Sequence, residues 1–200
     1  MTNSVNEVIS MALSFYELKM LARQTGLKVF CDEEKQMLII GGVGRNGVCH
    51  LIVHLVEDGE ALYFRIPYLA IVPEDHPHFT KILLTLLSEN DRVKLGRFCL
   101  DPEDGEVYID WFHSIEDGTL TSTQLLRCIK TLMILADEVR ARLKHLLETG
   151  EDLPEERRIE GMLRRLLSSG LPEEVEVRLR RLFQDFETSG EENEEDQSKE

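Results

Sequence analysis

Four polar side chains close together are the first candidates for chemistry in this chain. His76 and His78 stand beside Glu74 and Asp75, and imidazoles combined with carboxylates are typical zinc ligands. No further ligand pair with suitable spacing accompanies them, so the group is better explained as the polar start of a helix. An alternative function, a small-ligand or metal-binding sensor or enzyme, would have its pocket near His76 and His78.

A second pair of histidines occupies one strand. His50 and His54 are four residues apart in a segment that alternates polar and apolar side chains, which places both on one face. At about 3.3 Å per residue they lie roughly 13 Å apart and cannot share a metal ion unaided. Either they are two solvated histidines, or they form with Ile52 and Val56 a partly apolar surface that contacts a partner and changes charge near neutral pH.

The glycine-rich segment Gly42–Gly47 matches the G-x-G-x-x-G pattern of dinucleotide sites. Such a site needs a helix directly after the glycines, because the helix N-terminus holds the pyrophosphate. Here residues 48–56 alternate as a strand, which favours a hairpin. Within it, Asn46-Gly47 predicts a type I′ turn.

The acidic residues between 101 and 106 could supply paired carboxylates or a calcium loop. The twelve-residue calcium pattern with its closing glutamate is missing, and a strand follows. We interpret them as a hairpin turn, with Asp104-Gly105 at its positive-φ corner. Since no nucleophile elbow, phosphate loop or Ser/His/Asp arrangement is recognisable either, we assign no catalytic residue, no metal ligand and no cofactor.

Hydrophobic periodicity predicts the elements that position these residues. Apolar spacings of three and four predict helices over residues 5–22, 73–90 and 121–147, and alternation predicts strands over 27–31, 37–40, 48–56, 61–69, 93–100 and 106–113. Thr121 and Gln124 form a capping box that starts the last helix. The order α-ββββ-α-ββ-α predicts an α+β fold, an antiparallel sheet with helices on one face.

Alternation along the strands also predicts what the uncovered face of this sheet carries. In the strand over 106–113, Tyr108, Asp110 and Phe112 point away from Val107, Ile109 and Trp111. A face that carries Ile52 and several aromatic rings is too apolar to stay in water, which favours burial in a homodimer or under a peptide. The candidate partner-binding residues are His50, Ile52, His54, Tyr63, Tyr108 and Phe112.

The last 50 residues differ from the rest of the chain. Leu-Pro-Glu-Glu occurs at 153–156 and again at 171–174, each time followed by an arginine pair. Proline and acids early with arginines later suit a helix dipole, so we expect a helical hairpin over 151–187. Residues 188–200 are acidic, lack large apolar side chains and are expected to be disordered. The α+β domain would then span 1–150.

Charge and cysteine usage limit the partners and the compartment. The formal net charge is −15, which repels phosphate backbones and argues against nucleic acid as a partner. The four cysteines show no C-x-x-C spacing, which is typical of reduced thiols in the cytosol. No apolar run reaches the roughly 20 residues that span a bilayer. We expect a cytoplasmic protein without membrane insertion.

Short patterns between residues 86 and 137 resemble those of the YbjN family, whose fold is that of the type III secretion chaperones. They are Leu86-Leu87-Ser88-Glu89-Asn90, Gly96-Arg97-Phe98, the turn from Asp101 to Gly105, and Leu120-Thr121 with Asp137 further along. The resemblance covers residues 5–147 and implies small acidic dimers that hold partner proteins, with no catalytic residues. The sequence thus predicts a non-enzymatic protein-binding adaptor or chaperone-like regulator.

Overall fold

The computed structural model describes residues 12–116, 119–154, 159–163, 167, 174, 175 and 177. Its elements are α1 (Phe15–Gln24), β1 (Val29–Asp32), β2 (Met37–Val43), β3 (Val48–Val56), the 3₁₀ turn η1 (Glu57–Gly59), β4 (Ala61–Ile71), α2 (Phe79–Arg92), β5 (Arg97–Leu100), β6 (Glu106–Ser114) and α3 (Ser122–Thr149). The predicted order of elements is confirmed.

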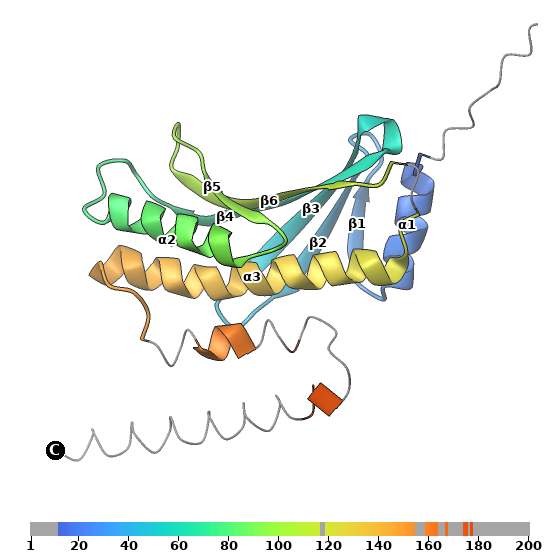
Figure 1. The fold of residues 1–200 in the computed structure, drawn as a ribbon. Helices are drawn as coiled ribbons and strands as arrows, with labels where there is room; N and C mark the ends of the chain where they lie inside the picture. Colours follow the sequence, from blue (N-terminus) through green and yellow to red (C-terminus); the bar gives the residue numbers. More distant parts are fainter. Residues whose placement is uncertain are drawn as a thin grey trace, which may run out of the picture.

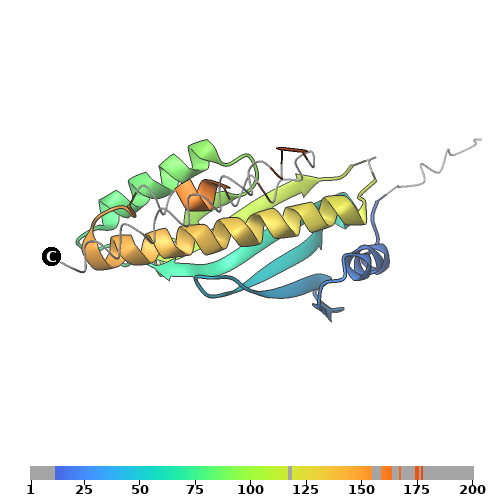
Figure 2. The ribbon, with the colours of Figure 1, turned by 90° about the horizontal axis from the view of Figure 1, so that it is seen from below.

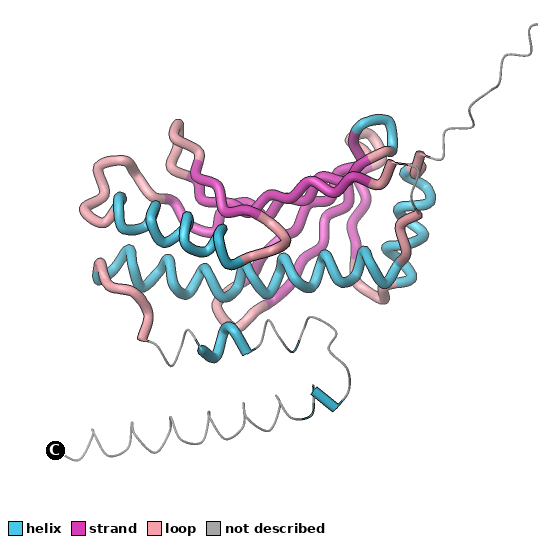
Figure 3. Tube along the Cα trace, in the orientation of Figure 1, coloured by secondary structure: helices cyan, strands magenta, loops and turns pink. Residues whose placement is uncertain are grey.

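The six strands form one antiparallel sheet in the order β1-β2-β3-β4-β6-β5. The first four strands follow one another as hairpins. The hairpin of β5 and β6 then adds to β4 through β6, so β5 becomes an edge strand. In Figures 1 and 2, α2 and α3 lie on the same side of this sheet, and Figure 3 shows the strands as one continuous layer behind them. The predicted α+β fold with helices on one face is confirmed.

The core lies between the sheet and α3. The inward side chains of α3 recur every three or four residues, and Leu125, Ile129, Leu132 and Leu143 are at most 1% exposed. They meet the inward residues of the strands, among them Leu51, Phe64 and Ile109, in one cluster. Fully burying one such side chain stabilises the fold by about 1.5–3 kcal/mol relative to leaving it exposed.

Capping side chains fix where two helices begin. Thr121 and Gln124 form the predicted capping box of α3, and α3 ends at Gly150, whose φ of 72° is left-handed. With 28 residues, α3 is about 42 Å long at 1.5 Å per residue. α1 begins later than the apolar pattern suggested: Ser14 caps it and forms a second capping box with Glu17. The part of the predicted first helix before residue 12 lies outside the described residues.

Two further boundaries and one turn differ from the sequence predictions. α2 begins at Phe79 because residues 73–78 form turns, and β5 begins at Arg97 because Gly96 has a φ of 87°. Between β2 and β3, Asn46 does not have the positive φ of a type I′ turn. The loop from Gly44 to Gly47 is instead shaped by contacts with α3, and the Gly44 amide donates to the Gly47 carbonyl over 2.9 Å. The acidic turn behaves as predicted, with Gly105 at a φ of 74°.

Candidate functional site: the uncovered face of the sheet

The sheet face opposite the helices, here called the open face, carries side chains in register across the strands. One row of paired positions, the first row, crosses all six strands and consists of Phe30, Ile39, Ile52, Arg65, Asp110 and Arg97. A neighbouring second row consists of Asp32, Met37, His54, Tyr63 and Phe112. Among the described residues no helix covers this face.

All six predicted partner-binding residues lie on the open face. Ile52 belongs to the first row, and His54, Tyr63 and Phe112 belong to the second row. His50 and Tyr108 lie two residues from row positions on their own strands and therefore face the same way. The phenyl ring of Phe112 is 43% exposed and that of Phe30, which the prediction did not include, is 66% exposed.

The open face is more charged than the sequence analysis expected. Glu106 and Asp110, 5% and 9% exposed, are buried carboxylates within it. Arg65 donates to Glu106 over 2.8 Å and lies over the ring of Tyr108, with 3.9 Å between its central carbon and the ring centroid. Arg97 reaches Asp110 through Nε at 3.2 Å and Nη2 at 3.4 Å. The apolar surface is therefore concentrated over β1–β3 and around Phe112.

Glu106 also holds a β-bulge in β4. The pairing of β4 with β6 shifts register between Ile66 and Ala70, and Tyr68 within this bulge has a φ of 53°. The amide of Tyr68 donates to the Glu106 carboxylate over 2.9 Å, which stabilises this left-handed conformation. As a result the Tyr68 side chain is 66% exposed beside the open face.

Burial shifts the pKa values of three titratable groups on the open face. Burial, followed by the charge of Asp110, raises the pKa of Cys99, so its thiol stays protonated near neutral pH. The same two causes raise the pKa of Tyr63. Burial lowers the pKa of His54 in spite of nearby Asp32, so this imidazole is neutral at pH 7. The shifts of Cys99 and Tyr63 disfavour the thiolate and the phenolate, which are the nucleophilic forms of these side chains.

The other proposed pocket, near His76 and His78, does not gather ligands. The two rings meet edge to face with 5.5 Å between their centroids, and Nδ1 of His76 accepts the His78 amide over 3.2 Å. His78 precedes α2 without a side-chain capping bond, and its ring packs against Gly150. Within the described residues, no group of three or more His, Cys, Asp or Glu side chains could hold a metal ion.

The glycine-rich loop binds a carboxylate of this chain. Asp137 of α3, 9% exposed, accepts the amides of Arg45 at 3.1 Å and Asn46 at 2.8 Å. The Asn46 side chain donates to the Asp137 carbonyl over 3.1 Å. A Cβ atom at Gly44 would come within 2.1 Å of this carboxylate, so glycine is required there. Periodicity could not reveal this contact, because the partners are more than 90 residues apart.

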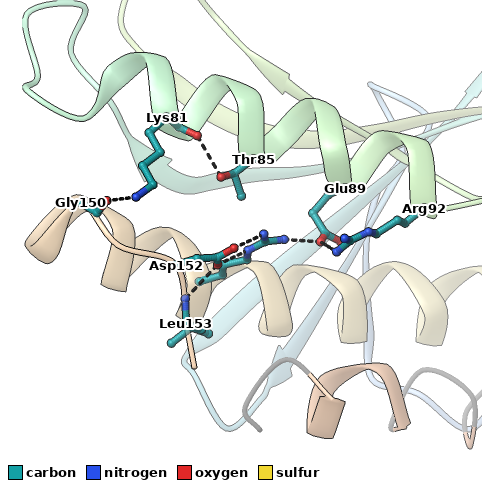
Figure 4. A network of polar contacts seen from close by, with 8 residues as sticks. Lys81, Thr85, Glu89, Arg92, Gly150, Asp152 and Leu153 are labelled. Atoms are coloured by element: carbon teal, nitrogen blue, oxygen red, sulfur yellow. Dashed lines mark hydrogen bonds and ion pairs between the residues drawn. The ribbon is translucent and has the colours of Figure 1, made fainter. Parts of the chain in front are cut away.

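A buried ion network attaches the start of the C-terminal segment to the helices, as Figure 4 shows. Arg142 of α3, 8% exposed, bonds Glu89 of α2 with Nη1 and binds Asp152 through Nε at 2.6 Å and Nη2 at 2.5 Å. Lys81 donates to the Gly150 carbonyl over 2.5 Å. These contacts join α2, α3 and residues 150–152.

Further along, residues 159–163 lie beside α3 on the side away from the sheet (Figures 1 and 2). Arg45 forms an ion pair with Glu160, and a Cβ atom at Gly161 would lie 3.3 Å from the Glu138 side chain. Most of the predicted helical hairpin over 151–187, and the whole acidic tail over 188–200, lie outside the described residues. The predicted boundary at residue 150 stays a prediction.

One antiparallel sheet with helices on a single side and an open opposite face defines the class of type III secretion chaperone-like folds. The chain belongs to the Tir chaperone protein (CesT) family, whose model matches residues 18–140. This confirms the family resemblance and the fold class expected from the sequence. No curated protein matches the chain. Among the described residues, no helix combines the length and apolar character needed to cross a membrane.

Three solved structures are similar to this chain. YbjN from E. coli is 14% identical with a TM-score of 0.49, and the match covers 66% of this chain and 94% of that one. The HopA1–SchA chaperone–effector complex contains a chain that is 16% identical with a TM-score of 0.43, covering 64% and 94%. A chain of the ExsC–ExsE complex is 18% identical with a TM-score of 0.46, covering 66% and 96%.

Proposed function

We propose that this protein is a non-enzymatic, chaperone-like adaptor that binds a segment of another protein on the open face. The observation that carries the proposal is the continuous pair of rows, in which Phe30, Ile52 and Phe112 stand next to aromatic and charged side chains without helical cover. Membership of the Tir chaperone protein (CesT) family supports the same function. A cytoplasmic location belongs to this proposal as well.

The binding mode is contact with the face of the sheet, because its two edge strands, β1 and β5, each offer only four residues to a partner strand. Asn90 of α2 bonds both main-chain groups of Phe98 on β5, so a partner strand cannot pair with Phe98. The outer edge of β1 spans only four residues. A partner that lies over the rows buries far more apolar area than one added to β1, and burial contributes about 25 cal/mol per Å² before association entropy is subtracted.

Photocrosslinking tests this proposal. A photoreactive amino acid placed at Ile52 should form a covalent adduct with a protein partner in cells of the organism that produces this protein. Phe112→Asp in the same chain should abolish that adduct. The matched control carries the photoreactive residue at Tyr16, which is 65% exposed on α1 and lies off the open face. Equal adducts from positions 52 and 16, or an adduct that Phe112→Asp leaves unchanged, would contradict the proposal.

We also propose that the chain forms a homodimer, through α2 and not through the open face. Leu84 and Leu87 lie one turn apart on α2 and are 61% and 64% exposed. A pair of exposed leucines on one helix face favours association with a second apolar surface. Pairing two copies through α2 would leave both open faces accessible to partners.

Sedimentation analysis tests the homodimer. Leu84→Glu combined with Leu87→Glu should give a monomer, whereas Tyr16→Glu, an equally exposed position on α1, should leave the mass unchanged. A wild-type chain that sediments as a monomer would overturn this second proposal but not the first. Loss of the dimer in Phe112→Asp would instead assign the open face to self-association.

A further inference from the structure

The first row changes chemical character partway across the sheet. Its positions on β1, β2 and β3 are Phe30, Ile39 and Ile52, whereas those on β4, β6 and β5 are Arg65, Asp110 and Arg97. Neighbouring strands are about 4.8 Å apart, so the apolar and charged halves extend over roughly 24 Å between Phe30 and Arg97. A segment lying across the strands therefore meets two different surfaces in succession.

Within the charged half, the groups turned toward a partner are cationic. The carboxylates of Glu106 and Asp110 are buried, and each already accepts from an arginine. The side chain of Arg97 is 66% exposed, and its contacts with Asp110 use Nε and Nη2, which leaves Nη1 for another acceptor. Arg65 is 32% exposed and is held in place by stacking on Tyr108.

The exposed positive charge of Arg97 and Arg65 is opposite in sign to the net charge of the whole molecule. A net charge of −15 favours basic partners at long range, but such steering is screened beyond roughly 8–10 Å at physiological salt. At contact distance, a carboxylate can bond the forked donors of an arginine, whereas a lysine at the same place would meet guanidinium groups. The surface next to Arg97 thus discriminates against the partners that the net charge would suggest.

We propose that the segment bound on the open face is amphipathic along its length, with apolar side chains over β1–β3 and a carboxylate, from Asp, Glu or a chain terminus, over Arg97. This inference rests on the proposed function, since it names the chemistry of the partner at the same site. Arg97 acts as the specificity-determining residue, while Arg65 keeps the neighbouring carboxylate neutralised. Binding through Arg97 weakens as salt concentration rises.

Fluorescence anisotropy with synthetic peptides tests the inference. The probes share an apolar half rich in Ile and Phe and differ in the other half, which carries Glu, Gln or Lys; each is made in both chain directions. The full-length protein should bind the Glu peptide about tenfold more tightly than the Lys peptide. Arg97→Gln should remove this preference, Arg97→Glu should reverse it, and Arg97→Lys should retain part of it.

Arg127→Gln is the matched control, because Arg127 is exposed on α3 at the helical side of the molecule and its loss changes net charge equally. An effect of Arg127→Gln equal to that of Arg97→Gln, or a preference for Lys, would overturn the inference. If all peptides bind equally and Phe112→Asp abolishes binding, the proposed function stands and the inference fails. If Phe112→Asp affects no peptide and none prefers Glu, both fail.

Discussion

The side chain of Asn90 replaces a neighbouring strand for Phe98. Its Oδ1 accepts the Phe98 amide over 2.7 Å and its Nδ2 donates to the Phe98 carbonyl over 2.9 Å, so one amide group from α2 satisfies both main-chain groups of Phe98 on the edge strand β5. Unpaired edge groups are sites of aggregation and strand addition. Asn90 therefore blocks strand pairing at Phe98 and also positions α2 along the β5 edge.

We predict that Asn90→Ala lowers the free energy of unfolding by about 1–3 kcal/mol, because two main-chain groups next to the buried Phe98 ring lose their partners. The reopened edge should also increase aggregation. Urea denaturation and light scattering measure the two effects. Asp91→Ala, at the next and exposed position, is the control, and equal stability of the two variants would contradict the role given to Asn90.

Gly44→Ala should destabilise the loop between β2 and β3, whereas Gly41→Ala should be nearly neutral. At Gly44 the added Cβ would lie 2.1 Å from Oδ1 of Asp137, but at Gly41 its nearest neighbour would be a ring carbon of His50 at 3.8 Å. Hydrogen exchange at the amides of Arg45 and Asn46 should become faster in Gly44→Ala. Unchanged exchange there would show that Asp137 does not hold the loop.

Loss of Arg142 should destabilise the protein more than loss of its partner Asp152. Arg142→Met removes the cation shared by Glu89, which is 3% exposed, and Asp152, and should cost about 3–5 kcal/mol of unfolding free energy. Asp152→Asn should cost less, since Arg142 keeps Glu89. Chemical denaturation of the two variants gives the comparison, and a larger loss for Asp152→Asn would contradict this order.

Acidification should destabilise the fold through two imidazoles. Burial lowers the pKa of His54 and His113 below the ordinary value of 6.5, so on acidification the unfolded chain takes up protons before the folded chain does. Their stabilising contribution is fully present above about pH 6.5 and is lost as the pH falls through the folded pKa values.

The double variant His54→Gln with His113→Gln should therefore lose less stability than the wild type between pH 7 and about pH 5.5. The carboxylates titrate in both proteins and cancel in the difference. If the unfolding free energies of the double variant and the wild type fell equally with pH, His54 and His113 would not be the source of the acid sensitivity.

The fold was accessible from the sequence because its signals are local. Alternation in β6 separates Tyr108 and Phe112 from Ile109 and Trp111, and the structure has Ile109 in the core cluster with Trp111 packed against it. The capping box at Thr121 was readable in the same way, and that at Ser14 carries the same four-residue signal. Both depend on residues three positions apart.

The charged half of the open face was not accessible in this way. Arg65 and Glu106 are 41 residues apart, so no periodicity links them. The same holds on the helical side, where Arg142 and Glu89 are 53 residues apart. The six residues predicted to contact a partner were placed correctly on one face by alternation alone, but whether they bind stays a prediction. The pairing between strands had to be known before Arg97 could be placed next to Asp110.

The position of Asp152 determines when the contacts of Arg142 can form during synthesis of the chain. Glu89 enters the growing chain long before Arg142, and Asp152 follows Arg142 by ten residues. The carboxylate of Glu89 therefore has no Arg142 to bind until the third helix has left the ribosome, and the bidentate clamp forms only when the next segment emerges. Among C-terminal deletions that end between residues 154 and 140, a first fall in folding yield should accordingly lie between 154 and 150, where Asp152 is lost, and a larger fall where Arg142 itself is removed.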